Sequence, residues 1–302
     1  MTSASSTPGA AATRRSGPSG LLTVPALVFF GIFAVAPLFV ALYLSFTNWS
    51  GLGTPQWIGF DNWRTLFTSS GTWHSILLTL QLMAVTWLIQ TPLSILLGVF
   101  LSGHQRYREI LAVIYFVPLL LSSAAIAIAF RNLLDPNFGM FAIPGLDWLN
   151  QNWLGDPNLA LMTVAGIIAW QFIPLHTLLY QGGARQVPQS LYEAAAIDGA
   201  GRRRQFFSIT LPQLRYTIVT STTLMLVGAL TYFDIIFILT QGGPSDSTRI
   251  LPLDMYLTGF VANKMGLASA IAIVLVVVGM ILSLTISKLS GFSRMESQLE
   301  GE

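Results

Sequence analysis

Only a few side chains in this sequence combine a reactive type with a position where chemistry is plausible. Asp234 is the single carboxylate inside a long apolar run, and a charge in such a place is a candidate for lining a polar pathway. Tyr232 and Phe233 beside it supply aromatic faces of the kind that stack on sugar rings. The alternative is structural: Asp234 pairs with a residue of another subunit, or lies near enough to the end of the run to be hydrated. The residues leave both interpretations open.

The preceding apolar run holds weaker candidates for the same pathway. Gln171 and Thr177 are polar residues of this run that could line the pathway. His176 is expected to form a hydrogen bond between helices rather than to bind a ligand. The other two histidines, His74 and His104, lie in other parts of the expected topology. No metal site is therefore expected.

Several classes of enzyme are excluded by what the sequence lacks. It has no cysteine, which rules out disulfides, zinc–thiolate sites and thiol catalysis. A phosphate-binding P-loop needs a lysine that follows glycine and precedes Ser or Thr, whereas Lys264 follows Asn263 and Lys288 follows Ser287. Neither paired carboxylates nor an activated nucleophile are visible, so we expect no enzyme activity and no ATPase site. The net charge of +2 is too small to indicate nucleic-acid binding.

The elements that must position these residues are membrane spans. Apolar residues make up 53% of the 302 residues and charged residues 9%, against about a quarter charged in a soluble domain. Six apolar runs are each long enough to cross about 30 Å of hydrocarbon, which predicts an all-α, polytopic membrane protein. They cover residues 21–46, 76–101, 110–130, 159–180, 217–240 and 267–289. The shorter stretch 250–262 contains Asp254 and is expected to be re-entrant or interfacial, and the Gly-rich segments 181–183 and 241–244 are expected to end helices.

Basic residues indicate the orientation of the spans. With both termini in the cytoplasm, eleven of the fifteen Lys and Arg residues are cytoplasmic and four are external. Residues 1–20 are expected to form a disordered cytoplasmic tail, followed by a transmembrane domain over 21–290 and a second cytoplasmic tail over 291–302. The first run is longer than the apolar core of a signal peptide, about 7–15 residues, so we expect an anchor.

A charged block between the fourth and fifth runs has the features of a docking helix. A helix start is predicted at Gln189 and Ser190, and the alanines at 194–196 would let this helix lie close to another surface. Gly199 predicts a turn, apolar side chains at 206–209 could enter a partner's groove, and Pro212 suits the first turn of a following helix. An amphipathic helix lying on the membrane surface would fit these residues equally well.

The same block resembles the cytoplasmic loop with a Glu-Ala-Ala motif in permease subunits of binding-protein-dependent ABC importers. It reads EAAAIDGAGRRRQFFSITLP from Glu193 to Pro212 and keeps the family's spacing of Glu-Ala-Ala, Gly and Ile-x-Leu-Pro at every position. A second segment, LTQGGPSDST from Leu239 to Thr248, resembles the sugar-importing branch, of the maltose/oligosaccharide and glycerol-3-phosphate permease type. Segments 46–49 and 58–63 resemble the first extracellular loop of that branch, although their tryptophans would also suit the aromatic belt of a membrane interface.

The resemblance implies a type I ABC importer permease fold with six transmembrane helices. Such a chain forms half of a translocation pathway for a sugar or sugar derivative. It couples transport, by alternating access, to ATP hydrolysis in a separate subunit. The implied cytoplasmic coupling loop covers residues 185–212, and the implied coupling residues are Glu193, Ala194, Ala195, Asp198, Gly199, Phe206, Phe207, Ile209, Leu211 and Pro212. Contacts to sugar are implied just before the Gly-Gly-Pro motif, where Tyr232, Phe233 and Asp234 fall.

The resemblance also implies the partners and the location. They are a second, homologous permease subunit, two copies of an ABC ATPase that bind ATP and Mg, an extracytoplasmic solute-binding protein, the sugar and the lipid bilayer. This chain would hold no cofactor and would lie in the cytoplasmic membrane of a bacterium or an archaeon. The rival function is a secondary transporter driven by an ion gradient through Asp234. It is disfavoured because the sequence shows neither several ionisable groups within spans nor the broken helices that such transporters use.

Overall fold

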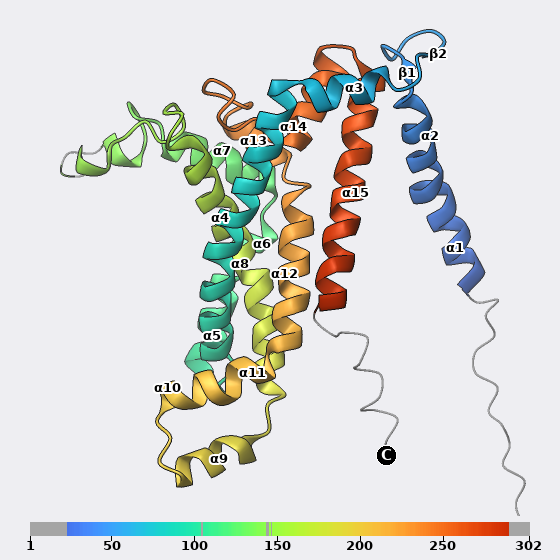
Figure 1. Cartoon of the computed structure of the whole chain (residues 1–302). Helices are drawn as coiled ribbons and strands as arrows, with labels where there is room; N and C mark the ends of the chain where they lie inside the picture. Colours follow the sequence, from blue (N-terminus) through green and yellow to red (C-terminus); the bar gives the residue numbers. More distant parts are fainter. Residues whose placement is uncertain (1–22, 104, 143–144, 146, 290–302) are drawn as a thin grey trace, which may run out of the picture.

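The computed structural model of the chain describes residues 23–103, 105–142, 145 and 147–289, and these residues are mainly helical (Figure 1). Four helical segments of the described chain are long and apolar enough to cross a membrane: Val24–Leu44, Ser70–Leu101, Ala160–Arg185 and Met265–Lys288. They confirm the first, second, fourth and sixth predicted runs as helices. The expected tails, 1–20 and 291–302, lie outside the described residues.

The first of these segments is made of α1 (Val24–Phe30), the π-helical η2 (Gly31–Val35) and α2 (Ala36–Leu44). It stands to one side of the bundle, touches α15 (Met265–Leu289) through α2, and buries none of its residues within this chain (Figure 1). The π segment ends two residues before Pro37, which has no N–H to donate to the preceding turn. This apolar helix is therefore free to contact lipid or another subunit.

The third predicted run is not one straight span, which corrects the sequence prediction. It forms α5 (Arg106–Tyr115), α6 (Val117–Leu120) and α7 (Ser123–Leu133), and the chain bends by 94° between α6 and α7. Ser122 has an extended backbone, and its hydroxyl accepts a hydrogen bond from the N–H of Ala125, so it caps a new helix instead of continuing the old one.

The fifth predicted run is also broken. Helix α12 (Arg215–Ala229) ends before an irregular segment, residues 230–233, and the short α13 (Asp234–Leu239) follows. Asp234 is the first residue of α13, where a carboxylate interacts favourably with the unpaired N–H groups of the helix start. By length and composition the described chain thus holds four membrane-spanning helices, or five if the bent pair of α5–α6 and α7 forms one span.

Helices α4 (Ser70–Leu101) and α8 (Ala160–Arg185) form the centre of the molecule and run side by side (Figure 1). Ser94 donates a hydrogen bond to the carbonyl oxygen of Ile173 at 3.2 Å, and Gln181 donates to that of Leu101 at 2.9 Å. The segment 181–183 lies within α8 and does not end it, contrary to the prediction. The main core joins these two helices to the broken ones, with Leu82, Ile126, Val164, Ile168 and Ile236 among its most buried members.

A glycine permits the close contact between α4 and α8, and it leads to a testable expectation. A Cβ atom on Gly98 would lie 2.6 Å from Cβ of Tyr180 and 2.9 Å from the Thr177 carbonyl oxygen. Gly98→Ala should therefore force the two helices apart and destabilise the protein by about 1–3 kcal/mol. Gly166→Ala in α8 is the control, since no atom lies within 4 Å of its Cβ position and alanine favours helix by about 0.5–1 kcal/mol. In thermal unfolding in detergent, Gly98→Ala should lower the midpoint temperature and Gly166→Ala should raise it. Equal shifts of the two midpoints would contradict the close packing at Gly98.

The two ends of the bundle carry different structures (Figure 1). At one end lie the strands β1 (Thr47–Asn48) and β2 (Gln56–Trp57), paired antiparallel, with α3 (Asp61–Thr68), α14 (Leu251–Tyr256) and the π-helical η6 (Leu257–Val261). The short 3₁₀ helices η3 (Met140–Ala142) and η4 (Asp147–Leu149) follow α7. At the other end lie α9 (Gln189–Ile197), α10 (Arg202–Gln205), the π-helical η5 (Phe206–Thr210) and α11 (Leu211–Gln213). The charged block and the aromatic first loop therefore lie at different ends of the bundle.

Candidate functional sites

Helix α9, which carries the Glu-Ala-Ala motif, projects from the bundle. It starts at Gln189 directly after Pro188, as predicted, and none of its nine residues, all described, is buried. Glu193 and Ala194 are exposed, Ala195 is half-buried, and Ile197 is 88% exposed. The helix thus leaves an apolar side chain and small alanine side chains uncovered within this chain.

Gly199 ends α9 in a defined way. Its φ is +75°, the left-handed region that glycine reaches without strain. The N–H of Ala200 donates to the Ala195 carbonyl at 2.8 Å, and the N–H of Gly199 donates to the Ala196 carbonyl at 3.0 Å. These two bonds are the pair that closes a helix with a Schellman turn. The predicted turn is confirmed, and exposed Asp198 is the last residue before it.

The chain beyond this turn ties α9 to the bundle. The hydroxyls of Tyr192 and Thr210 are 2.9 Å apart, and the Gln205 amide donates to the Ala200 carbonyl at 3.0 Å. Phe206 packs with the buried Tyr180 and Leu214, so it faces its own bundle. These contacts connect α9 to the ends of α8 and α12.

The remaining residues of the coupling set face different ways. Phe207 is 65% exposed, Ile209 and Leu211 are half-buried, and Pro212 is exposed. The π-helical η5 ends at Thr210, two residues before Pro212, and the N–H of Leu211 bonds to the Phe206 carbonyl. Among these residues Phe207 is the apolar side chain most available to a partner.

A second site lies where the two broken helices begin. A cavity of about 330 Å³ is lined by the first residue of α7, the first residue of α13, the segment between α12 and α13, and one face of α8. This volume is within the range of small-molecule sites. Its lining residues are Ser123, Phe172, Leu175, His176, Leu224, Gly228, Thr231, Tyr232, Phe233, Asp234 and Ile235. The structure thus brings the predicted Tyr232, Phe233 and Asp234 to one cavity.

Asp234 is exposed, and no described residue makes a hydrogen bond or an ion pair with its carboxylate. The aromatic rings beside it are held in place. Tyr232 stacks on Phe172 with ring centres 5.3 Å apart, and Phe233 stacks on Phe237 at 5.2 Å. A fixed aromatic wall and an available carboxylate can bind the apolar face and the hydroxyls of a polyhydroxylated ligand.

Gln171 and Thr177 do not line this cavity. Gln171 is buried and donates to the Ser123 hydroxyl at 3.1 Å, so it positions a lining residue, while Thr177 is fully buried. His176 is buried with its Nδ1 3.0 Å from the Ser221 hydroxyl, which confirms the expected hydrogen bond between helices. Sequence reasoning missed Ser123, although the Ser-Ser pair at 122–123 is a recognisable helix start.

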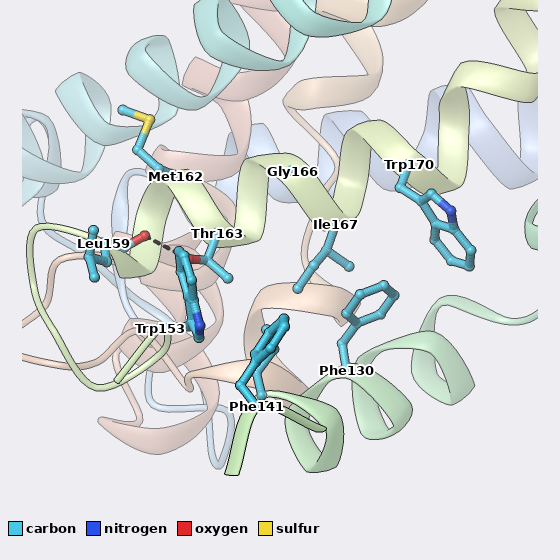
Figure 2. A pocket seen from close by; sticks show the side chains of 10 residues that line it. Phe130, Phe141, Trp153, Leu159, Met162, Thr163, Gly166, Ile167 and Trp170 are labelled. Atoms are coloured by element: carbon cyan, nitrogen blue, oxygen red, sulfur yellow. Dashed lines mark hydrogen bonds between the residues drawn. The ribbon is translucent and has the colours of Figure 1, made fainter. Parts of the chain in front are cut away.

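A larger cavity, about 440 Å³, lies beside α7 and α8 at their other ends (Figure 2). Its walls are Phe130, Phe141, Trp153 and Trp170 with aliphatic residues. The hydroxyl of Thr163 is occupied by the Leu159 carbonyl at 3.0 Å, the dashed line in Figure 2. No described carboxylate, amide or basic side chain lines this cavity, so it is a poorer candidate for a sugar site than the cavity at Asp234.

Long apolar helices, two broken helices around a cavity that holds one carboxylate, and an exposed connecting helix are features of a multi-pass membrane protein. The chain belongs to the family described as the inner membrane component of binding-protein-dependent transport systems, whose pattern matches residues 90–290. This membership confirms the resemblance drawn from the Glu-Ala-Ala block. It also agrees with the missing P-loop, because the members of this family are permease subunits and the ATPase is a separate chain.

Individual relatives cover nearly the whole chain. It is 32% identical to the multiple sugar-binding transport system permease protein MsmF of Streptococcus mutans, over 89% of this chain and 93% of the relative. It is also 32% identical to the probable ABC transporter permease protein PH1215 of Pyrococcus horikoshii, over 87% and 92%. Its fold matches a chain of the bacterial alginate ABC transporter solved with an alginate pentasaccharide-bound periplasmic protein. That match has a TM-score of 0.79, 24% identity and coverage of 91% and 94%.

Proposed function

We propose that this chain forms half of the translocation pathway of an ABC importer for a sugar or sugar derivative. The observation that carries the sugar path is the cavity at the starts of α7 and α13. Transporters place substrate sites where helices are interrupted, because helix ends supply polar groups inside an apolar medium. Here the interruption also presents Asp234 beside the ring stack of Tyr232 and Phe172. Relatives named for sugars, such as MsmF, support this substrate class.

Coupling to ATP hydrolysis is proposed to run through the loop 185–212. The apolar residues Ile197 and Phe207 and the motif residues Glu193 and Ala194 are exposed within this chain, as a docking surface requires. A cleft on the ATPase subunit would take α9. Closure of the ATPase would then pull on the bundle through the Tyr192–Thr210 contact and through Phe206.

The proposed assembly contains a second, homologous permease subunit, two ATPase copies that bind ATP and Mg, and a solute-binding protein outside. Six spans with both termini in the cytoplasm are proposed, with α5–α7 and α12–α13 as the two interrupted spans, and residues 250–262 as an external piece. The membrane is the cytoplasmic membrane of a bacterium or an archaeon, since relatives occur in both Streptococcus mutans and Pyrococcus horikoshii.

The family membership argues against the rival function, a secondary transporter driven by an ion gradient. The sequence prediction that this chain lacks broken helices is wrong, because α5–α7 and α12–α13 are broken. The family membership and the single carboxylate within the predicted spans still favour the ABC importer.

Replacing the catalytic residues of the ATPase partner tests this function. Uptake into proteoliposomes that contain the assembled complex should vanish with a hydrolysis-dead ATPase, because this chain has no P-loop. The purified chain alone should hydrolyse no ATP. A carrier driven by an ion gradient would keep its uptake with the dead ATPase and lose it with an ionophore, and that result would overturn the proposal.

A further inference from the structure

The cavity at Asp234 carries a net negative charge. Among the described residues that line it, Asp234 is the one carboxylate and none is Lys or Arg. Two arginines elsewhere are engaged with other partners: Arg249 with Asp254 at 2.7 Å, and Arg131 with the Ile238 carbonyl at 3.5 Å. His176 is buried without a described carboxylate partner, where a charged imidazolium would be costly.

The start of α7 adds a weaker, opposite effect. A helix N-terminus bears about half a positive charge, and part of its N–H capacity is used here by the Ser122 hydroxyl. The start of α13 adds a smaller partial positive charge than a long helix would, because this helix has only six residues. The full negative charge of the Asp234 carboxylate therefore exceeds the sum of the partial positive charges of the two helix starts, and the cavity stays net negative.

We propose that Asp234 makes this half of the pathway selective for uncharged sugars and against acidic ones. The inference rests on the proposed function and names the substrate class of the same cavity. Sugar hydroxyls can donate to the carboxylate, whereas the carboxylate of a uronic acid would face a like charge with no described cation to pair with. Acidic sugars are a real alternative in this fold, since the transporter of similar fold was solved with alginate.

The absence of native cysteine allows a direct test of the cavity's charge. Ser123→Cys in the assembled complex places a thiol on the wall supplied by α7. Its modification by a trimethylammonium methanethiosulfonate should be about tenfold faster than by the sulfonatoethyl reagent, after correction for their rates with a free thiol. Asp234→Asn should remove this preference. Phe138→Cys, 92% exposed in a loop, is the control and should show no change with Asp234→Asn. An equal rate for both reagents at Ser123→Cys with Asp234 present would overturn the proposal.

Protection of the same thiol by sugars tests the selectivity itself. Matched pairs, such as galactotriose with trigalacturonate and cellotriose with its triuronate, are added before labelling. We expect the neutral member to protect and the acidic member to fail unless Asp234 is replaced by Asn. Protection by both members of a pair with Asp234 present would refute the charge selectivity. If no sugar slows labelling while the preference for the cationic reagent persists, the proposed sugar path is wrong and the charge assignment stands.

Discussion

Gly199→Val should abolish transport while leaving the chain in the membrane. The φ of +75° and the two closing bonds at Ala195 and Ala196 place this residue in a left-handed conformation. A residue with a side chain pays about 1–2 kcal/mol there, and a β-branched one is the worst case. This conformational cost would act on α9, none of whose residues is buried within this chain. Little packing would oppose a change of the turn, so α9 would lose its fixed direction. Co-purification of the ATPase subunits and uptake are the measurements.

Gly201→Val is the matched control. Gly201 lies two residues later in the same exposed turn, no atom lies within 4 Å of its Cβ position, and its backbone is extended (φ −67°, ψ 165°), which valine adopts readily. The Gly201→Val variant should still bind the ATPase subunits and should transport at the wild-type rate. Gly199→Asn should keep part of both, because asparagine tolerates the left-handed region. Wild-type uptake by Gly199→Val would remove the role assigned to this turn.

Arg249→Met should lower the stability of the assembled permease by about 3 kcal/mol. The Arg249 guanidinium binds Asp254 through Nη2 at 2.7 Å and Nε at 2.9 Å, and the Asp254 side chain is only 7% exposed. Removing the arginine leaves a buried carboxylate unpaired, which is far costlier than losing the attraction itself. This carboxylate lies in α14, which contributes to the main core through Leu253. The measurement is thermal unfolding of the complex in detergent.

Two further variants separate the buried pair from ordinary surface charge. Asp246 also approaches Arg249, at 3.6 Å, but its side chain is 63% exposed, so Asp246→Asn should change stability by less than about 1 kcal/mol. The double variant Arg249→Met/Asp254→Leu should recover much of the loss, since two apolar groups need no partner. A double variant as unstable as Arg249→Met would show that shape, rather than an unpaired charge, causes the effect.

The candidate sites were predictable to different degrees. The turn at Gly199 was predictable from local chemistry, because a glycine after an alanine-rich helix is a signal contained in a few adjacent residues. Tyr232, Phe233 and Asp234 were found because polar and aromatic groups stand out in an apolar run. Ser123 and Phe172 complete the same cavity from other helices, and their contribution needed the packing of α7 and α13 against α8.

Hydropathy along the chain predicted the class of protein and the long helices, because it is a sum over neighbouring residues and an apolar run must pair its backbone internally. It did not determine where the third and fifth runs break. An isolated apolar segment prefers to continue as helix, and Ser122 or residues 230–233 only permit a break. The break is stabilised when α7 and α13 pack together through Ile126, Ala127 and Ile236, a contact between residues about a hundred positions apart. The positions of the breaks therefore depend on long-range packing, because the free energy of that burial is gained only once the distant segments have met.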